Sequence, residues 1–176
     1  MKSITMLCSL FFYVNVFAHS SDDIQMSKGQ ICDVNVGRNI GELLNDGETL
    51  KVEKFSGEGE AYFVFHVPIL NCGIVKVYAG DQWLKIFQLE TDNKSYVTTR
   101  GARVGMTLEE LRGLYPEVYI TYPKTDFKYF SLGFFLPDDE GYFEINAEIL
   151  REKCKIDYDS CKNDFQKLTA KKFVTS

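Results

Sequence analysis

The sequence predicts an α+β domain built on a mainly antiparallel β-sheet, with one capped helix in the middle of the chain, a second helix at the C-terminus and disulfide bracing. Three observations predict it. Apolar and polar side chains alternate with the two-residue period of strands at residues 50–89 and 118–147. A complete helix-start pattern at Thr107 separates these stretches. Four cysteines lie outside the N-terminal apolar run, an even number that suits disulfides.

An export signal precedes the expected domain. Lys2 supplies the charged start, an apolar run follows at residues 4–14, and Ala18 is the small residue before the cleavage point. The apolar run is too short to span a bilayer. We therefore expect residues 1–18 to be removed and residues 19–176 to form one domain without a membrane span, periplasmic or secreted. A domain of that size buries roughly 70% of the surface that its unfolded chain exposes.

The first half of the chain is expected to contribute a short helix and several strands. Residues 39–44 fit a short helix that ends in a turn. The run at residues 61–67 has apolar side chains on both faces, which predicts a central strand covered on both sides and ended by Pro68. Gly80-Asp81 predicts a two-residue hairpin turn. The strands expected here are residues 50–52, 61–67, 74–78 and 83–89.

The middle helix has the clearest local signals. Thr107 can accept a hydrogen bond from a free amide of the first turn, and Glu110 can bond back to the Thr107 amide, which makes a capping box. A helix that begins there must end before Pro116, because the residue before a proline avoids helical backbone angles. We therefore predict a helix over residues 107–114.

The second half of the chain is expected to alternate strands with a final helix. The C-terminal segment from Asp159 or Ser160 to about Lys171 has helical spacing, with Phe165 and Leu168 on one side. Lysines at its end suit the negative end of the helix dipole. The other elements expected here are strands at residues 118–122, 130–136 and 143–147, with a hairpin loop at residues 137–141.

The cysteines permit three disulfide pairings. The closure of short loops favours Cys32–Cys72 and Cys154–Cys161. Two positions seven residues apart on one straight helix lie about 10.5 Å apart, which is too far for a disulfide. The chain must therefore turn between Cys154 and Cys161 if they are paired. Disulfides persist in oxidising compartments, in agreement with export.

Charge and composition exclude several classes of partner. The formal net charge is −5, and removal of the signal with its single Lys2 makes it one unit more negative. Nucleic acids and anionic membranes would repel such a domain. The charge favours a protein partner, and a basic one in particular.

Few groups suited to catalysis are present. The chain has two histidines, of which only His66 lies inside the expected domain, and it has no Cys-x-x-Cys pair, so we expect no metal site. No Gly-x-Ser-x-Gly motif accompanies His66, which we interpret as a strand histidine with a hydrogen-bonded ring. We name no catalytic residue and expect no cofactor. A pair of carboxylates acting as a hydrolase of cell-wall glycans stays open as an alternative.

Tyrosines and acids form the expected contact surface. Asp138, Asp139 and Glu140 lie in the hairpin loop, and Tyr129 and Tyr142 lie close to it in the sequence. Tyrosine is favoured at interfaces because it offers a large area and a hydroxyl at a small entropic cost. The sequence thus favours a non-enzymatic binding protein, with a structural helper in envelope assembly as a further alternative. Tyrosines that flank strands because they suit sheets are the competing explanation.

Two stretches carry a resemblance to known families. The sequence from Arg103 to Leu111, followed by Tyr115-Pro116, resembles a strand-to-helix element of many small bacterial secreted proteins of unassigned role. The tail around Cys154 and Cys161 resembles the C-terminal disulfide region of periplasmic immunity proteins, which neutralise cell-wall amidases delivered by type VI secretion. The second resemblance implies an inhibitor or immunity factor for an envelope-acting enzyme. Neither resemblance assigns a role to an individual residue.

Overall fold

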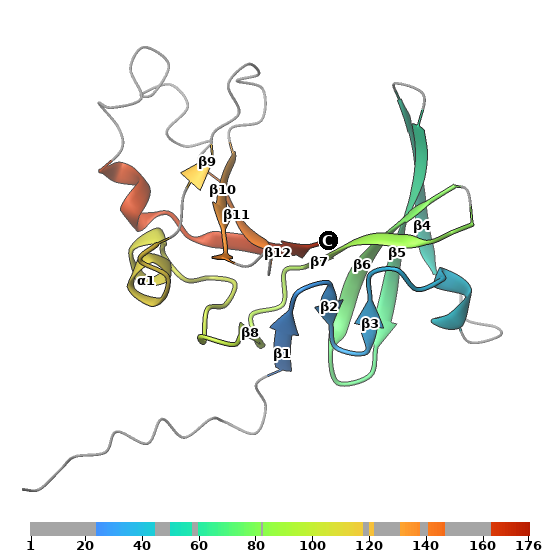
Figure 1. Cartoon of the computed structure of the whole chain (residues 1–176), viewed down its shortest axis with the longest axis horizontal. Helices are drawn as coiled ribbons and strands as arrows, with labels where there is room; N and C mark the ends of the chain where they lie inside the picture. The colour runs from blue at the N-terminus through green and yellow to red at the C-terminus, as the bar shows by residue number, and fades with distance from the viewer. Residues whose placement is uncertain are drawn as a thin grey trace, which may run out of the picture.

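Two β-sheets form the framework of the protein (Figure 1). The structure is a computed structural model that describes residues 24–44, 50–57, 60–81, 83–117, 120–121, 131–137, 141–146 and 163–176. The large sheet has eight strands in the order β4-β5-β6-β7-β12-β11-β10-β9, and its neighbouring pairs are antiparallel, as the sequence predicts. These strands are β4 (Lys51–Gly57), β5 (Glu60–Ile69), β6 (Gly73–Gly80), β7 (Ile86–Thr91), β9 (Ile120–Thr121), β10 (Ser131–Phe135), β11 (Tyr142–Asn146) and β12 (Ala170–Thr175).

A small sheet packs against one side of the large one. It has four strands in the order β3-β2-β1-β8, and its β1–β8 pair is parallel. Buried Met26, Ile31 and Val34 of this sheet belong to the same core as Val77 and Leu89 of the large sheet. The strands are β1 (Ile24–Ser27), β2 (Gln30–Ile31), β3 (Val34–Asn35) and β8 (Tyr96–Thr98).

Short helices pack on the side of the large sheet that faces the core. The expected early helix is the 3₁₀ helix η1 (Ile40–Glu42), and the expected middle helix is α1 (Leu108–Leu114). At the start of α1 the Glu110 amide donates to the Thr107 hydroxyl oxygen, and the Thr107 amide donates to the Glu110 carboxylate. Leu108 and Leu111 are fully buried in the core. No helix in the described ranges is long and apolar enough to cross a membrane.

The C-terminal segment differs from the expected helix. The structure has a single 3₁₀ turn, η4 (Asp164–Lys167), followed by the strand β12. Phe165 and Leu168 are buried as their spacing predicts. From Ala170 onward, however, the backbone pairs with β7 on one side and β11 on the other, and Phe173 is fully buried between them. The two ladders and the buried face outweigh the local helical preference, and β12 joins the two halves of the large sheet.

Two turn predictions also need correction. Pro68 does not end β5 but lies inside it, paired with Ile74. The β4 ladder reaches only as far as His66, so the missing amide of Pro68 costs no ladder bond on that side. The β6–β7 hairpin is as expected, but β6 ends at Gly80 and β7 begins only at Ile86, so Trp83 lies in the loop where the sequence predicts a strand.

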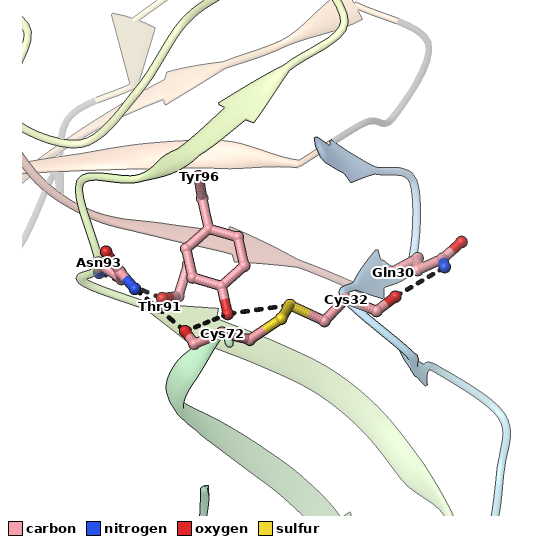
Figure 2. The surroundings of a disulfide bond; sticks show 6 residues. All are labelled: Gln30, Cys32, Cys72, Thr91, Asn93 and Tyr96. Atoms are coloured by element: carbon pink, nitrogen blue, oxygen red, sulfur yellow. Dashed lines mark hydrogen bonds between the residues drawn. A yellow bond between two sulfur atoms is a disulfide. The ribbon is translucent and has the colours of Figure 1, made fainter. Parts of the chain in front are cut away.

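The disulfide Cys32–Cys72 ties the two sheets together (Figure 2). It links the turn after β2 to the turn between β5 and β6, with a Cα–Cα distance of 6.6 Å. The Tyr96 hydroxyl donates to the Cys72 carbonyl oxygen at 2.7 Å, and the Asn93 side-chain amide donates to the same oxygen at 3.0 Å. This pairing is the one that loop closure favours. Cys154 and Cys161 lie outside the described residues.

Candidate partner-binding face

The two faces of the large sheet carry different side chains. Cross-strand partners point to the same face, so the row Phe65, Val77 and Leu89 defines a core face that is buried against the small sheet. The next row, His66, Lys76 and Glu90, defines the opposite face, which we call the outer face. On the outer side of β5 Val64 is 4% exposed, so the prediction of a strand covered on both sides holds there, although Phe55 and Phe87 on other strands of this face are half-exposed.

Four aromatic side chains gather on the outer face, and we call them the aromatic cluster. Phe55 stacks on Tyr62, with ring centroids 5.2 Å apart. Phe87 meets Tyr62 edge to face at 6.0 Å and also contacts Tyr78 at 6.3 Å. Phe55 and Phe87 keep 42% and 43% of their surface exposed, which is a large apolar area for rings in mutual contact. Such a cluster is typical of an interaction surface.

A β-bulge explains how four strands bring these rings together. Phe55 and Tyr62 are direct partners across the β4–β5 ladder. In the β6–β7 ladder Tyr78 pairs with Gln88, but the next pair is Ala79 with Ile86, so Phe87 is an extra residue. A bulge redirects the side chain of its extra residue. It turns Phe87 toward Tyr62 and Tyr78.

Next to the aromatic cluster lies a network of charged groups around Glu90. The residue is 3% exposed, and its carboxylate accepts bonds from Lys76 Nζ at 2.7 Å and Lys172 Nζ at 3.1 Å. The Tyr78 hydroxyl donates to it at 2.9 Å. Lys172 also contacts the Glu144 carboxylate at 3.0 Å. Tyr78 therefore belongs to both groups, with its ring in the aromatic cluster and its hydroxyl in the network.

The network favours the charged forms of Glu90 and Lys172 and the neutral form of Tyr78. Burial raises the pKa of Glu90, but the bonds from Lys76, Lys172 and Tyr78 outweigh burial and hold this pKa below its ordinary value. Burial lowers the pKa of Lys172, but Glu144 and Glu90 reverse that effect and raise it. Burial, with the charge of Glu90, raises the pKa of the Tyr78 hydroxyl. Glu90 stays ionised, which suits an anchor for the sheet better than the general acid of a hydrolase.

Trp83 projects from the β6–β7 loop at the same end of the sheet as Phe55 and Tyr62. Its side chain is 85% exposed, and its φ of 70° is followed by a φ of 47° at Leu84. Left-handed backbone angles are unfavourable for such residues. The segment before η1 holds the loop in place, because the Asn39 side-chain amide donates to the Trp83 carbonyl oxygen at 2.6 Å and the Ile40 amide donates to that of Leu84 at 3.0 Å. These bonds hold the backbone of Trp83 and Leu84, and the large aromatic side chain of Trp83 is exposed.

Only one residue of the contact surface that the sequence suggests lies in the described part of the chain. Tyr142 is on the outer face, in the same cross-strand row as Val174 and Glu90, and its ring stacks on Phe135 at 4.9 Å. Burial and the nearby Glu144 raise its pKa. Tyr129, Asp138, Asp139 and Glu140 lie outside the described residues.

The sequence interpretation of His66 is confirmed. Its Nε2 lies 3.0 Å from Glu53 Oε1 on the neighbouring strand, and Lys51 Nζ lies 2.7 Å from the same oxygen. The side-chain hydrogen bonds of Lys51 and His66 lower the pKa of Glu53. Among the residues that the structure describes, no group of three or more His, Cys, Asp or Glu side chains is arranged to hold a metal ion.

Sequence reasoning missed the aromatic cluster and Trp83. One signal was available, namely the presence of apolar side chains on both faces of residues 61–67. That signal predicts a strand covered on both sides, but it does not show that Tyr62 lies among half-exposed rings of neighbouring strands. Phe87 had no signal of its own, because the bulge that redirects it depends on the pairing of β6 with β7.

Comparison with known proteins supports the fold alone. No protein-family model matches the chain, and no curated protein is significantly similar to it in sequence. The chain is similar to the crystal structure of the uncharacterized protein yfeY from Escherichia coli, with a TM-score of 0.53 and 10% sequence identity. The match covers 87% of this chain and 98% of the other. The overall fold is thus shared with a known structure, at a sequence identity that carries no activity across.

Proposed function

We propose that this chain is an exported, non-enzymatic binding protein that holds a protein partner against the aromatic cluster of its outer face, as an inhibitor or immunity factor for an envelope-acting enzyme would. The single observation that carries the proposal is the half-exposed state of Phe55 and Phe87 on a strongly hydrogen-bonded sheet. Rigid aromatic side chains are the commonest anchors of protein interfaces.

The surroundings of the aromatic cluster favour a protein over a small molecule. Tyr78 is fixed through its hydroxyl by Glu90, so its ring needs little further ordering when a partner binds. Trp83 adds a third exposed aromatic side chain at the same end of the sheet, and its backbone carbonyl is bonded to Asn39. A broad surface with such anchors suits a partner that brings its own apolar pocket.

Compartment and charge support the rest of the proposal. The Cys32–Cys72 disulfide is typical of proteins outside the reducing cytoplasm, in agreement with the export signal at residues 1–18. A net charge of −5 attracts a basic partner and speeds its association at low salt. The acids at Asp138 and Asp139 supply part of that charge.

The test begins with the exported protein purified from its producing cell, together with any partner it captures. The affinity of the purified partner is then measured for the double variant Phe55→Ser, Phe87→Ser, where we expect a loss of about tenfold or more. Leu70→Ser is the matched control, since Leu70 is 88% exposed but lies in the β5–β6 turn at the opposite end of the sheet. Equal affinity for both variants contradicts the proposed surface.

The acidic loop is tested separately with the triple variant Asp138→Ala, Asp139→Ala, Tyr142→Ala. If the loop contributes, the affinity of a basic partner falls and its dependence on salt becomes weaker. An unchanged affinity removes the loop from the surface and leaves the aromatic cluster as the binding site.

A further inference from the structure

Strand β4 forms one edge of the large sheet. It pairs with β5 on one side, and within the described ranges no backbone bond reaches its other side. An exposed strand edge is a template on which another strand can form. The backbone N–H and C=O groups of β4 that are free can be found from the directions in which the backbone groups of β5 point.

One hydrogen bond fixes those directions. The Asp81 amide donates to the Ala61 carbonyl oxygen at 3.2 Å, so Ala61 points its backbone groups toward β6. Successive residues of an antiparallel strand point their N–H and C=O groups to opposite sides. Ala61 therefore makes no backbone hydrogen bond with Ser56, its partner in β4. The same alternation applies to Lys54 and Val52. These three residues therefore point their N–H and C=O groups away from the sheet.

The side chains of β4 give Lys54 no acidic partner in the central pairings with a second copy of this chain. A twofold antiparallel pair centred on Lys54 places two lysines opposite each other, and the pair centred on Glu53 places two glutamates opposite each other. The pair centred on Phe55 places Lys54 opposite Ser56, which offers no counter-charge. Like charges in direct opposition destabilise a strand pair. Pairs centred further from the middle of β4 form hydrogen bonds with fewer of its outward-pointing N–H and C=O groups.

The same side chains favour a complementary strand. Lys54 lies 5.6 Å from the centre of the Phe63 ring and makes no ion pair within the described residues, so its charge is available to an incoming acidic group. Val52 and Phe55 are 47% and 42% exposed on the two faces of the strand. Phe55 also belongs to the aromatic cluster, so the edge and the proposed partner-binding face are continuous.

We infer that β4 receives an extended segment of the partner protein as an added strand, with an acidic residue opposite Lys54 and apolar residues beside Phe55. The inference rests on the proposed function and names the way in which the partner is held. Backbone bonds to Val52, Lys54 and Ser56 supply attachment, and the side chains on either face supply selectivity. A partner that is basic overall can carry this one acidic residue.

A synthetic peptide tests the edge without knowledge of the partner. The probe is acetyl-TVFEFVT-amide, which reads the same in both directions and therefore presents its central acid to Lys54 in either orientation. Two matched peptides serve as controls: acetyl-TVFKFVT-amide, and the first peptide with N-methyl groups at its second, fourth and sixth residues. Binding to the full exported protein is followed by residue-resolved amide hydrogen exchange and by titration.

We expect the acidic peptide to slow exchange at the amides of Val52, Lys54 and Ser56 by about tenfold or more, with smaller changes at Glu53 and Phe55, whose amides already bond to β5. The N-methylated peptide should bind at least about tenfold more weakly. The lysine peptide should bind more weakly to the natural protein and more tightly to the Lys54→Glu variant. Equal binding of all three peptides, or no protection along β4, overturns the inference.

The captured partner separates this inference from the proposed function. If the partner binds and the Phe55→Ser, Phe87→Ser variant weakens it, but the amides of Val52, Lys54 and Ser56 gain no protection, the strand addition is wrong and the proposed face stands. If the natural protein dimerises and these amides are protected in the dimer alone, a second copy is the occupant and the inference fails. If peptide and partner compete for β4, it is upheld.

Discussion

Two rows of side chains cross the large sheet one residue apart, and they are stabilised in different ways. Phe65, Val77 and Leu89 are buried on the core face and need only close packing. In the neighbouring row Glu90 is almost as buried, but it is stabilised by Lys76 and Lys172. The core face thus supplies stability through burial, whereas the outer face combines an ion-pair network that anchors the sheet with half-exposed aromatic side chains.

The test with the largest expected effect on stability replaces one aromatic side chain on each face of the large sheet. Phe173 is fully buried on the core face, where its ring centroid lies 5.2 Å from that of Phe143. Phe173→Ala should lower the free energy of unfolding by about 3–5 kcal/mol, because it removes a buried ring and leaves a cavity. Phe87→Ala should cost about 1 kcal/mol, since Phe87 is 43% exposed. Urea unfolding measures both, and equal losses would contradict the distinction between the faces.

The disulfide tests how much the core face depends on its link to the small sheet. Replacing Cys32 and Cys72 together with serine should cost about 2–4 kcal/mol, because the bridge spans 40 residues of sequence and its loss frees the unfolded chain. Affinity for the partner should change little, since both residues lie on the side away from the aromatic cluster. A large loss of affinity in a folded double variant would show that the two faces are coupled.

The network around Glu90 tests the outer face itself. Glu90→Gln keeps the shape of the side chain but leaves the Lys76 ammonium without its counter-charge and Lys172 with Glu144 alone, and we expect a loss of about 2–3 kcal/mol. The loss stays below that of a fully buried pair because the side chains of Lys76 and Lys172 are 39% and 28% exposed. Glu144→Gln is the matched control and should cost less than about 1 kcal/mol, because Glu144 is 30% exposed.

The same network makes stability depend on pH in a definite direction. The folded pKa of Glu90 lies below 4.5, so its contribution is present above pH 4.5 and is lost as the pH falls through the folded value. Lys172 has a folded pKa above 10.5, so its contribution is present below pH 10.5 and is lost as the pH rises further. Unfolding curves of the natural protein and Glu90→Gln should therefore converge in acid. Parallel curves would mean that Glu90 is not the group responsible.

Local signals predicted some of these features and not others. The start of α1 follows from Thr107 and Glu110 because a capping box needs only four consecutive residues. The pair Cys32–Cys72 follows from loop closure. Strand β12 could not be predicted, because the helical spacing of Phe165 and Leu168 continues into a segment whose structure is decided by the gap between β7 and β11.

The candidate face was harder to predict than the core for the same reason. The aromatic cluster draws one ring from each of four strands, and one of the four depends on a bulge. No window of sequence contains that information. The sequence proposes Tyr142 for the contact surface because it lies near the acidic loop in the chain, whereas its stacking on Phe135 depends on the pairing of β10 with β11.

The change in stability expected for Trp83 is small, and its sign is the opposite of the others. Trp83 has a φ of 70° and is 85% exposed, so its side chain adds strain to the backbone and little packing. Asparagine tolerates left-handed angles far better. Trp83→Asn should therefore raise the free energy of unfolding by about 1 kcal/mol, while the affinity for the partner falls about tenfold. Leu70→Asn is the control and should leave affinity unchanged. A Trp83→Asn variant that is more stable but binds the partner more weakly shows that Trp83 serves binding. A loss of stability would mean that Trp83 supports the fold.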